Sequence, residues 1–220
     1  MNYYKYNINI KYLNKLCIIS FIPLFIIISY LDLYHYCDFF FLIIYFLWMF
    51  LHEFLHGLGF YFNKNINRKN IVYGACLEKG IFYCMCKQEI SKNKIILSTL
   101  FPFFIIGILT FFLGILISNP MLELLSLFNI VGCVGDLSMF FFFIKLPHFN
   151  YIDLDDCTGF VLISEHDLNK FTNKCFKIVE VDDFSKLEKP NSFKKFNFSR
   201  FSIFILSVLI IFFLIYIIKI

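Results

Sequence analysis

The sequence predicts an all-α polytopic membrane protein with about five transmembrane helices, a small membrane-associated β-hairpin and a small cytoplasmic segment. Three observations support this class: 60% of the 220 residues are hydrophobic, only 16% are charged, and the apolar residues occur in long blocks. Soluble domains are about 45–50% apolar and about 25% charged. The mean hydropathy of +0.74 excludes a disordered chain, and no basic stripe interleaved with aromatic residues indicates a nucleic-acid partner.

Five blocks are long enough to cross a bilayer, which takes about 17–25 apolar residues per helix. They are residues 13–31, 39–62, 95–118, 121–144 and 201–218. The first block also fits a signal peptide preceded by basic residues, but no small-x-small cleavage site follows it, which favours an uncleaved span. The spans divide the chain into a membrane-embedded core (1–145), a cytoplasmic segment (146–200) and a C-terminal transmembrane helix (201–220).

The distribution of Lys and Arg predicts how the spans are oriented, because cytoplasmic loops carry an excess of both. The N-terminal segment and the segments 63–94 and 145–200 are basic, whereas the loops 32–38 and 119–120 contain neither residue. Basic and non-basic segments therefore alternate along the chain. We expect an integral membrane protein, surrounded by the lipid bilayer, whose N-terminus is cytoplasmic and whose C-terminus lies outside.

Two apolar runs with β-strand character, 71–76 and 81–86, flank a turn-forming stretch that ends in Gly80. We expect a β-hairpin over 71–86 that lies against the membrane or neighbouring helices, since both of its faces are apolar. Two interpretations of its role are open: an edge strand that binds an extended substrate by β-addition, or a plug at the cytoplasmic mouth. Residues 159–164 and 176–181 are candidates for short strands of the cytoplasmic segment.

The second span contains the motif H-E-x-x-H, formed by His52, Glu53 and His56. Residues i and i+4 share one helix face, so both imidazoles can bind one Zn²⁺, and Glu53 can act as general base towards a zinc-bound water. An ionisable group inside a span raises the free energy of membrane insertion by about 2.5–3.5 kcal/mol. Three such groups within five residues therefore indicate a shared function. The alternative is a span that ends earlier and leaves His52 and Glu53 at the interface, but apolar residues continue beyond them.

Asp136 in the fourth span is the candidate third ligand, because catalytic zinc sites use three protein ligands. Counted from the outer ends of their spans at 1.5 Å per residue, His52 lies about 20 Å deep, His56 about 26 Å and Asp136 about 21 Å. The three residues thus share one level in the cytoplasmic half of the bilayer. The alternative partner of Asp136 is a Lys or Arg, and none lies mid-span. Asn129, further out on the same span, is a candidate for binding a substrate carbonyl or oxyanion, or for cross-linking helices.

An H-E-x-x-H span followed by an Asn…Gly-Asp span resembles the site-2-protease-like intramembrane metallopeptidases, whose Asn…Asp-Gly segment supplies the third zinc ligand. The sequence is also similar to an uncharacterised bacterial family of membrane zincin peptidases, through residues 52–57, Tyr83-Cys84, Pro102, Asn129…Gly135-Asp136 and Asp156…Gly159-Phe160. The resemblance covers roughly residues 39–160. It implies Zn²⁺ held by His52, His56 and Asp136, Glu53 as the catalytic residue, and a bacterial cell membrane as the location. The order Gly135-Asp136 is reversed relative to site-2 proteases.

The motif and the resemblance predict a zinc-dependent membrane-embedded endopeptidase that hydrolyses peptide bonds of membrane-associated proteins or peptides near the cytoplasmic face. In this interpretation Glu53 activates a zinc-bound water for attack on the peptide carbonyl. One alternative is a non-catalytic polytopic membrane protein, such as a metal carrier or a pseudo-protease chaperone. Another is a metal-dependent hydrolase of a lipid-linked substrate, which the zinc chemistry does not exclude.

Overall fold

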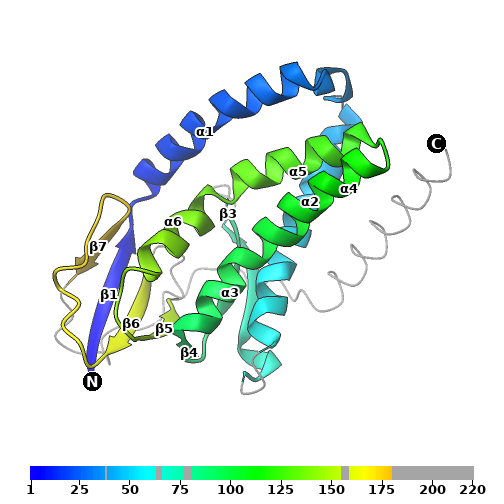
Figure 1. Cartoon of the computed structure of the whole chain (residues 1–220). Coiled ribbons are helices and arrows are strands. Elements are labelled where there is room, and N and C mark those ends of the chain that lie inside the picture. Colours follow the sequence, from blue (N-terminus) through cyan, green and yellow to red (C-terminus); the bar gives the residue numbers. More distant parts are fainter. Residues whose placement is uncertain (38, 63–65, 77–80, 155–158, 180–220) are drawn as a thin grey trace.

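The computed structural model describes residues 1–179 except 38, 63–65, 77–80 and 155–158. Within this part of the chain, a bundle of apolar helices carries a β-sheet at one end, and a separate β-hairpin lies along the bundle (Figure 1). The predicted fifth span at 201–218 and the residues 180–200 that precede it lie outside the described residues.

Three helices among the described residues are long and apolar enough to cross a membrane. They are α1 (Ile10–Tyr30), α2 (Phe39–Tyr61) and the continuous helical stretch Lys92–Leu116. These helices coincide with the first three predicted spans. The short 3-10 helices η1 (Leu33–Tyr36) and η2 (Arg68–Asn70) follow α1 and α2.

The third of these helices changes its hydrogen-bond pattern part-way along. Helix α3 (Lys92–Pro102) passes into the π-helix η4 (Phe103–Leu109) and then into α4 (Thr110–Leu116). Proline has no backbone N–H, so the regular α-helical bonds cannot continue through Pro102, and wider turns follow it.

The predicted fourth span is broken. Helices α5 (Pro120–Gly132) and α6 (Val134–Phe143) meet at Cys133 with a bend of 47°. Asn119 starts α5 because its side chain accepts a hydrogen bond from the N–H of Leu122 at 3.0 Å. Counted as one span, this pair raises the number of candidate spans in the described residues to four, which correspond to the first four of the five predicted spans.

A five-stranded antiparallel sheet corrects the predicted all-α class. Its order is β4-β5-β6-β1-β7, and its strands are β1 (Asn2–Ile8), β4 (Ile90–Ser91), β5 (Asn150–Asp153), β6 (Gly159–Ser164) and β7 (Phe176–Val179). Strands β6 and β7 correspond to the two short strands that we expected, and the N-terminal strand β1 pairs between them. The prediction missed β1, β4 and β5 because short strands scattered over the chain carry little periodic signal.

Three strands of the sheet are continuous with membrane helices. Strand β1 leads through Asn9 into α1, β4 leads directly into α3, and α6 returns to β5. The Asn9 side chain accepts a hydrogen bond from the N–H of Tyr12 at 3.2 Å and so starts α1. The sheet therefore ties together the ends of α1, α3 and α6 on one side of the bundle (Figure 1).

Two hydrophobic cores stabilise the described part of the chain. The first lies between the sheet and α6, and its fully buried side chains include Tyr6, Phe143, Phe160 and Phe176. The second joins α1, α2, η4 and α5, and includes Leu24, Phe41, Ile106 and Leu124. The outward faces of α1, α2 and α4 instead expose large apolar side chains, as expected of helices in lipid.

The predicted hairpin at 71–86 is present as β2 (Ile71–Cys76) and β3 (Ile81–Cys86), with Tyr73 opposite Cys84. It lies along α2, because the ring centroid of Phe82 is 4.8 Å from that of Phe50 and 5.7 Å from that of Phe46. These edge-to-face contacts fix β3 beside the turn of α2 that carries the H-E-x-x-H motif.

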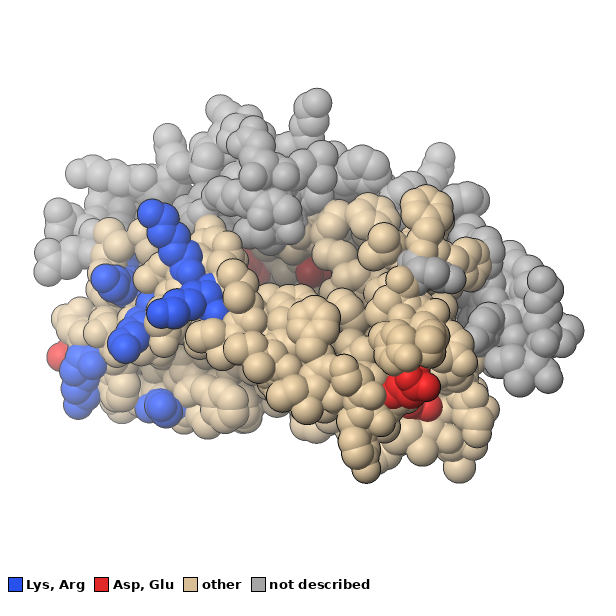
Figure 2. Space-filling view, turned by 90° about the horizontal axis from the view of Figure 1, so that it is seen from above, with Lys and Arg blue, Asp and Glu red and all other residues tan. Residues whose placement is uncertain are grey.

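Basic side chains are unevenly distributed over the molecule. Figure 2 shows Lys and Arg gathered at one end of the visible face, which is the end where Figure 1 shows the sheet. The cytoplasmic position of this end stays a prediction from the positive-inside rule.

Candidate metal centre

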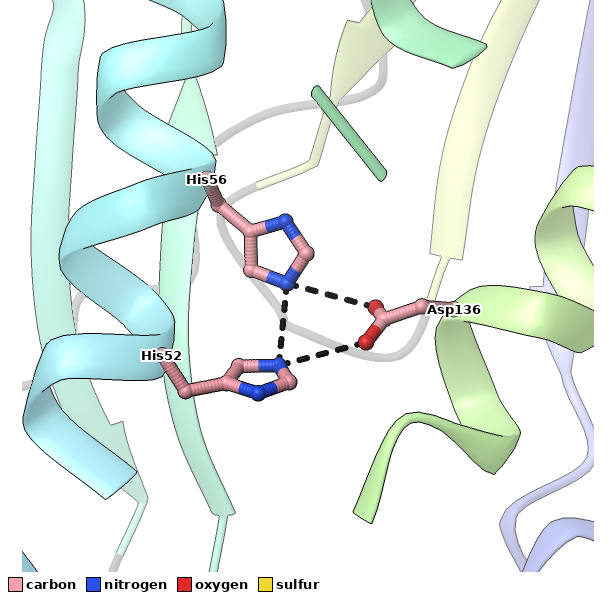
Figure 3. Close-up of side chains that lie close together, drawn as sticks. All are labelled: His52, His56 and Asp136. Carbon is pink, nitrogen blue, oxygen red and sulfur yellow. Dashed lines mark hydrogen bonds and ion pairs between the residues drawn. The ribbon is translucent and has the colours of Figure 1, made fainter. Parts of the chain in front are cut away.

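The side chains predicted to bind a metal lie together between α2 and α6 (Figure 3). His52 Nε2 is 3.2 Å from Asp136 Oδ2, His56 Nε2 is 3.3 Å from Asp136 Oδ1, and the two Nε2 atoms are 3.2 Å apart. Figure 3 shows both imidazole rings pointing from one face of α2 toward the carboxylate. The side chains are 13%, 11% and 19% exposed, so the cluster is sheltered but still accessible.

One ligand atom from each of the three side chains lies within 4.8 Å of the others, and each Nε2 atom lies from its nearest carboxylate oxygen and from the other Nε2 atom at a spacing typical of zinc ligands. Bonds of about 2.0–2.1 Å from a tetrahedral centre place neighbouring ligand atoms about 3.3 Å apart. Two imidazole nitrogens and a carboxylate oxygen also form a donor set that catalytic zinc sites use, with a fourth position left for water or substrate. The residues present therefore fit Zn²⁺, and their assignment as its ligands stays a prediction.

The break between α5 and α6 brings Asp136 to the site. Asp136 lies in the first turn of α6, directly after the 47° bend at Cys133. Backbone hydrogen bonds continue across the bend, from Cys133 N to Asn129 O at 2.9 Å and from Leu137 N to Cys133 O at 2.8 Å. The bend is therefore stabilised by backbone hydrogen bonds on both sides of Cys133, and it places the Asp136 carboxylate next to the two histidines of α2.

Each histidine is also held from behind through its Nδ1 atom. His52 Nδ1 is 2.9 Å from Asn129 Oδ1, and His56 Nδ1 is 2.9 Å from the carbonyl oxygen of Ser98. Such outer contacts fix the ring orientation of metal-binding histidines. Asn129 is 4% exposed and links α5 to α2, which is a helix cross-link; its role towards an oxyanion is not tested by these contacts.

Glu53 contacts the hairpin. Its carboxylate accepts a hydrogen bond from the backbone N–H of Cys84 on β3. The N–H of Cys86, two residues along, donates to Asp153 Oδ2 at 2.8 Å. Both donors lie on the edge of β3 that faces away from β2, so these two N–H groups are not available to an added strand. This favours a plug at the cytoplasmic mouth over an edge strand that binds substrate.

Two glycines of α2 allow these close contacts. A Cβ atom on Gly57 would lie 1.7 Å from the Tyr73 hydroxyl of the hairpin, and one on Gly59 would lie 2.6 Å from the Cα atom of Ser98 on α3. Ser98 also donates its hydroxyl to the carbonyl oxygen of His56 at 2.7 Å. The hairpin and α3 therefore approach α2 where it lacks side chains, directly after the H-E-x-x-H turn.

Comparison with known proteins covers the same part of the chain. A family model described as "Putative zincin peptidase" matches residues 45–150. The matched stretch contains the H-E-x-x-H turn, the hairpin, α3 and Asp136, and over it the chain is zincin-like. Neither the curated proteins nor the solved structures contain a match to this chain.

Proposed function

We propose that the protein is a zinc-dependent, membrane-embedded endopeptidase of site-2-protease-like type. The observation that carries the proposal is the triangle of His52, His56 and Asp136, whose ligand atoms are spaced for one zinc ion beside a glutamate of the same helix. The zincin-like match over residues 45–150 supports a peptidase. The long apolar helices that carry the site support a membrane location, with the bacterial cell membrane as the implied compartment.

The chemistry follows from the positions of these side chains. When bound, Zn²⁺ supplies a Lewis acid that lowers the pKa of water and polarises a carbonyl group. Glu53 accepts a proton from the attacking water while the water oxygen bonds to the carbonyl carbon of the substrate. Glu53 then donates this proton to the amine nitrogen as the C–N bond breaks, which restores its carboxylate.

The substrate class follows from the surroundings of the site. Apolar helices enclose the triangle, and its side chains are sheltered at 11–19% exposure, so the scissile bond has to enter between membrane helices. A helical segment hides its carbonyl groups in its own hydrogen bonds, so the substrate has to be extended at the cleaved bond. We expect membrane-associated proteins or peptides, cleaved near the cytoplasmic face.

The experiment that tests this function compares the wild type with Glu53→Gln. Each full-length protein is expressed in cells, zinc is measured in the purified protein by mass spectrometry, and new N-termini are mapped in the membrane fraction. We expect Glu53→Gln to retain zinc and to lose the new N-termini, because only the proton transfer is removed.

A matched control is Glu123→Gln, which changes a membrane-domain glutamate in the first turn of α5 that takes no part in the triangle. It should give the wild-type zinc content and the wild-type N-termini. Identical N-termini in the wild type and Glu53→Gln would contradict the peptidase. Zinc bound without any new N-termini in the wild type would favour the non-catalytic metal-binding alternative.

A further inference from the structure

Pro102 leaves one backbone carbonyl of α3 without its usual donor. In an α-helix the N–H of residue i+4 donates to the carbonyl of residue i, and Pro102 is residue i+4 of Ser98. Proline has no N–H, so the carbonyl of Ser98 cannot be paired in this way. The next N–H along the chain, that of Phe103, donates to the Leu100 carbonyl instead.

His56 uses the carbonyl that Pro102 leaves open. Its Nδ1 atom is 2.9 Å from the Ser98 carbonyl oxygen. A carbonyl only accepts hydrogen bonds, so we assign the ring proton to Nδ1, which donates it. The Nε2 atom then presents a lone pair toward Asp136 and His52.

The carbonyl of Pro102 itself determines which ring nitrogen of His52 carries the proton. It accepts a hydrogen bond from Asn129 Nδ2 at 3.3 Å, so the amide nitrogen of Asn129 has to face Pro102. The amide oxygen therefore faces His52, and Oδ1 lies 2.9 Å from His52 Nδ1. By the same reasoning His52 carries its proton on Nδ1 and presents the lone pair of Nε2.

We infer that Pro102 is a positioning residue for the metal centre, which acts through the Ser98 carbonyl on His56 and through Asn129 on His52. Both Nε2 lone pairs then converge with the Asp136 carboxylate: the two Nε2 atoms are 3.2 Å apart, and each lies 3.2–3.3 Å from a different carboxylate oxygen. Acceptors this close repel one another unless a cation lies between them. The inference rests on the proposed metal site. This role differs from bending α3, because it depends on the missing N–H of Pro102 and on the Ser98 carbonyl that is left free to accept from His56.

The test changes the donor at position 102 and measures metal binding. In Pro102→Ala the new N–H competes with His56 for the Ser98 carbonyl. Zn²⁺ affinity is measured by competition with a chelator on the full chain in detergent, and Co²⁺ is used as a second probe through its visible absorption. We expect Pro102→Ala to bind Zn²⁺ about 10–100-fold more weakly and to shift the Co²⁺ spectrum. The unfolding midpoint of the metal-free protein should not fall, since a helical hydrogen bond is regained.

Two further proteins separate the missing N–H from any other effect of the change. The α-hydroxy analogue of alanine at position 102 places an ester there, which has the shape of alanine and no N–H. It should recover most of the wild-type affinity. Pro23→Ala removes the proline inside α1, away from the triangle, and should bind zinc as the wild type does.

The outcomes distinguish this inference from the proposed function. Wild-type affinity in Pro102→Ala, or equally weak binding by alanine and its ester analogue, would overturn the role of Pro102 and leave the metal site standing. A wild-type protein that binds neither Zn²⁺ nor Co²⁺ would overturn the proposed function, and the inference with it.

Discussion

Asp153 is a carboxylate of the sheet that lies close to the candidate metal centre. It accepts hydrogen bonds from the N–H of Cys86 at 2.8 Å and from the Tyr151 hydroxyl. Burial raises its pKa from the usual 3.8 to about 6, and the two hydrogen bonds only partly oppose this shift. The carboxyl group therefore binds a proton more tightly in the folded protein than in the unfolded chain.

Asp153 should make stability depend on pH in the acidic range. A raised folded-state pKa contributes stability that is fully present below 3.8 and is lost as the pH rises through about 6. Asp153→Asn removes this contribution and can keep both hydrogen bonds, with Oδ1 toward Cys86. In thermal unfolding of the metal-free protein, the midpoint of the wild type should fall relative to that of Asp153→Asn as the pH rises from 3.8 to about 6. Parallel curves would contradict the assignment, and Glu165→Gln, at an exposed carboxylate, serves as the control.

Single residues also show what the sequence can predict about the site. His52, His56 and Asp136 were found because ionisable side chains are conspicuous in apolar spans and share one calculated depth. The contacts of the Ser98 carbonyl and the Cys84 N–H could not be predicted, because every residue has these backbone groups and the residue type does not show which of them will be used. Gly57 and Gly59 were the available hint, since two glycines in one turn of a helix indicate that other segments approach it closely.

At the scale of elements, the contact between α2 and α3 determines the position of the turn that carries His56. Gly59 faces the backbone of Ser98, and Ser98 holds the main chain and the ring of His56. A change in the separation of these two helices therefore moves His56 directly, although neither Gly59 nor Ser98 is part of the triangle.

Gly59→Ala should separate α2 from α3. The new methyl group would lie 2.6 Å from the Ser98 Cα atom, which is backbone and cannot rotate away. We expect a loss of about 1–3 kcal/mol in the free energy of unfolding. Gly135→Ala is the matched control, because no atom lies within 4 Å of its added Cβ. It should be neutral or stabilising by about 0.5–1 kcal/mol. Equal unfolding midpoints for the two variants would contradict the packing argument.

Elements also mark the limit of the sequence prediction. Hydropathy located α1, α2 and the stretch Lys92–Leu116, since a long apolar block is a strong signal. It joined α5 and α6 into one span, because both halves are apolar and the bend at Cys133 changes direction without changing composition. That bend places Asp136 in the first turn of a new helix, a detail that a depth calculation along a straight span does not contain.

At the scale of the whole molecule, the sheet connects segments that are far apart in the sequence. Strand β1 pairs with β6 on one side and β7 on the other. Tyr6 of β1 is fully buried, stacks on Phe160 at 5.5 Å and donates its hydroxyl to the carbonyls of Leu168 and Phe171. The N-terminal residues are thus part of the core at one end of the helical bundle.

Tyr6→Ala should be among the most damaging changes outside the metal centre. Removing a fully buried aromatic ring leaves a cavity and is expected to cost about 3–5 kcal/mol of unfolding free energy. Tyr6→Phe removes the hydroxyl alone and should cost about 1 kcal/mol. Tyr3→Ala, at an exposed position of the same strand, should stay within about 0.5 kcal/mol of the wild type. Denaturant unfolding of the four proteins measures the series, and a Tyr6→Ala midpoint close to that of Tyr3→Ala would show that β1 is peripheral.

The position of β1 between β6 and β7 also affects the order in which the protein can assemble during synthesis. Asn2 pairs with Ser164 and Ile8 with Phe176, so β1 waits for its two neighbours until β6 and β7 have also left the ribosome. By then α2 and α6 have been made, so the two halves of the metal centre can meet before the sheet closes. A chain that stopped short of β6 would hold the metal-binding residues with an N-terminal strand that has neither partner, and an unpaired strand invites association with other chains.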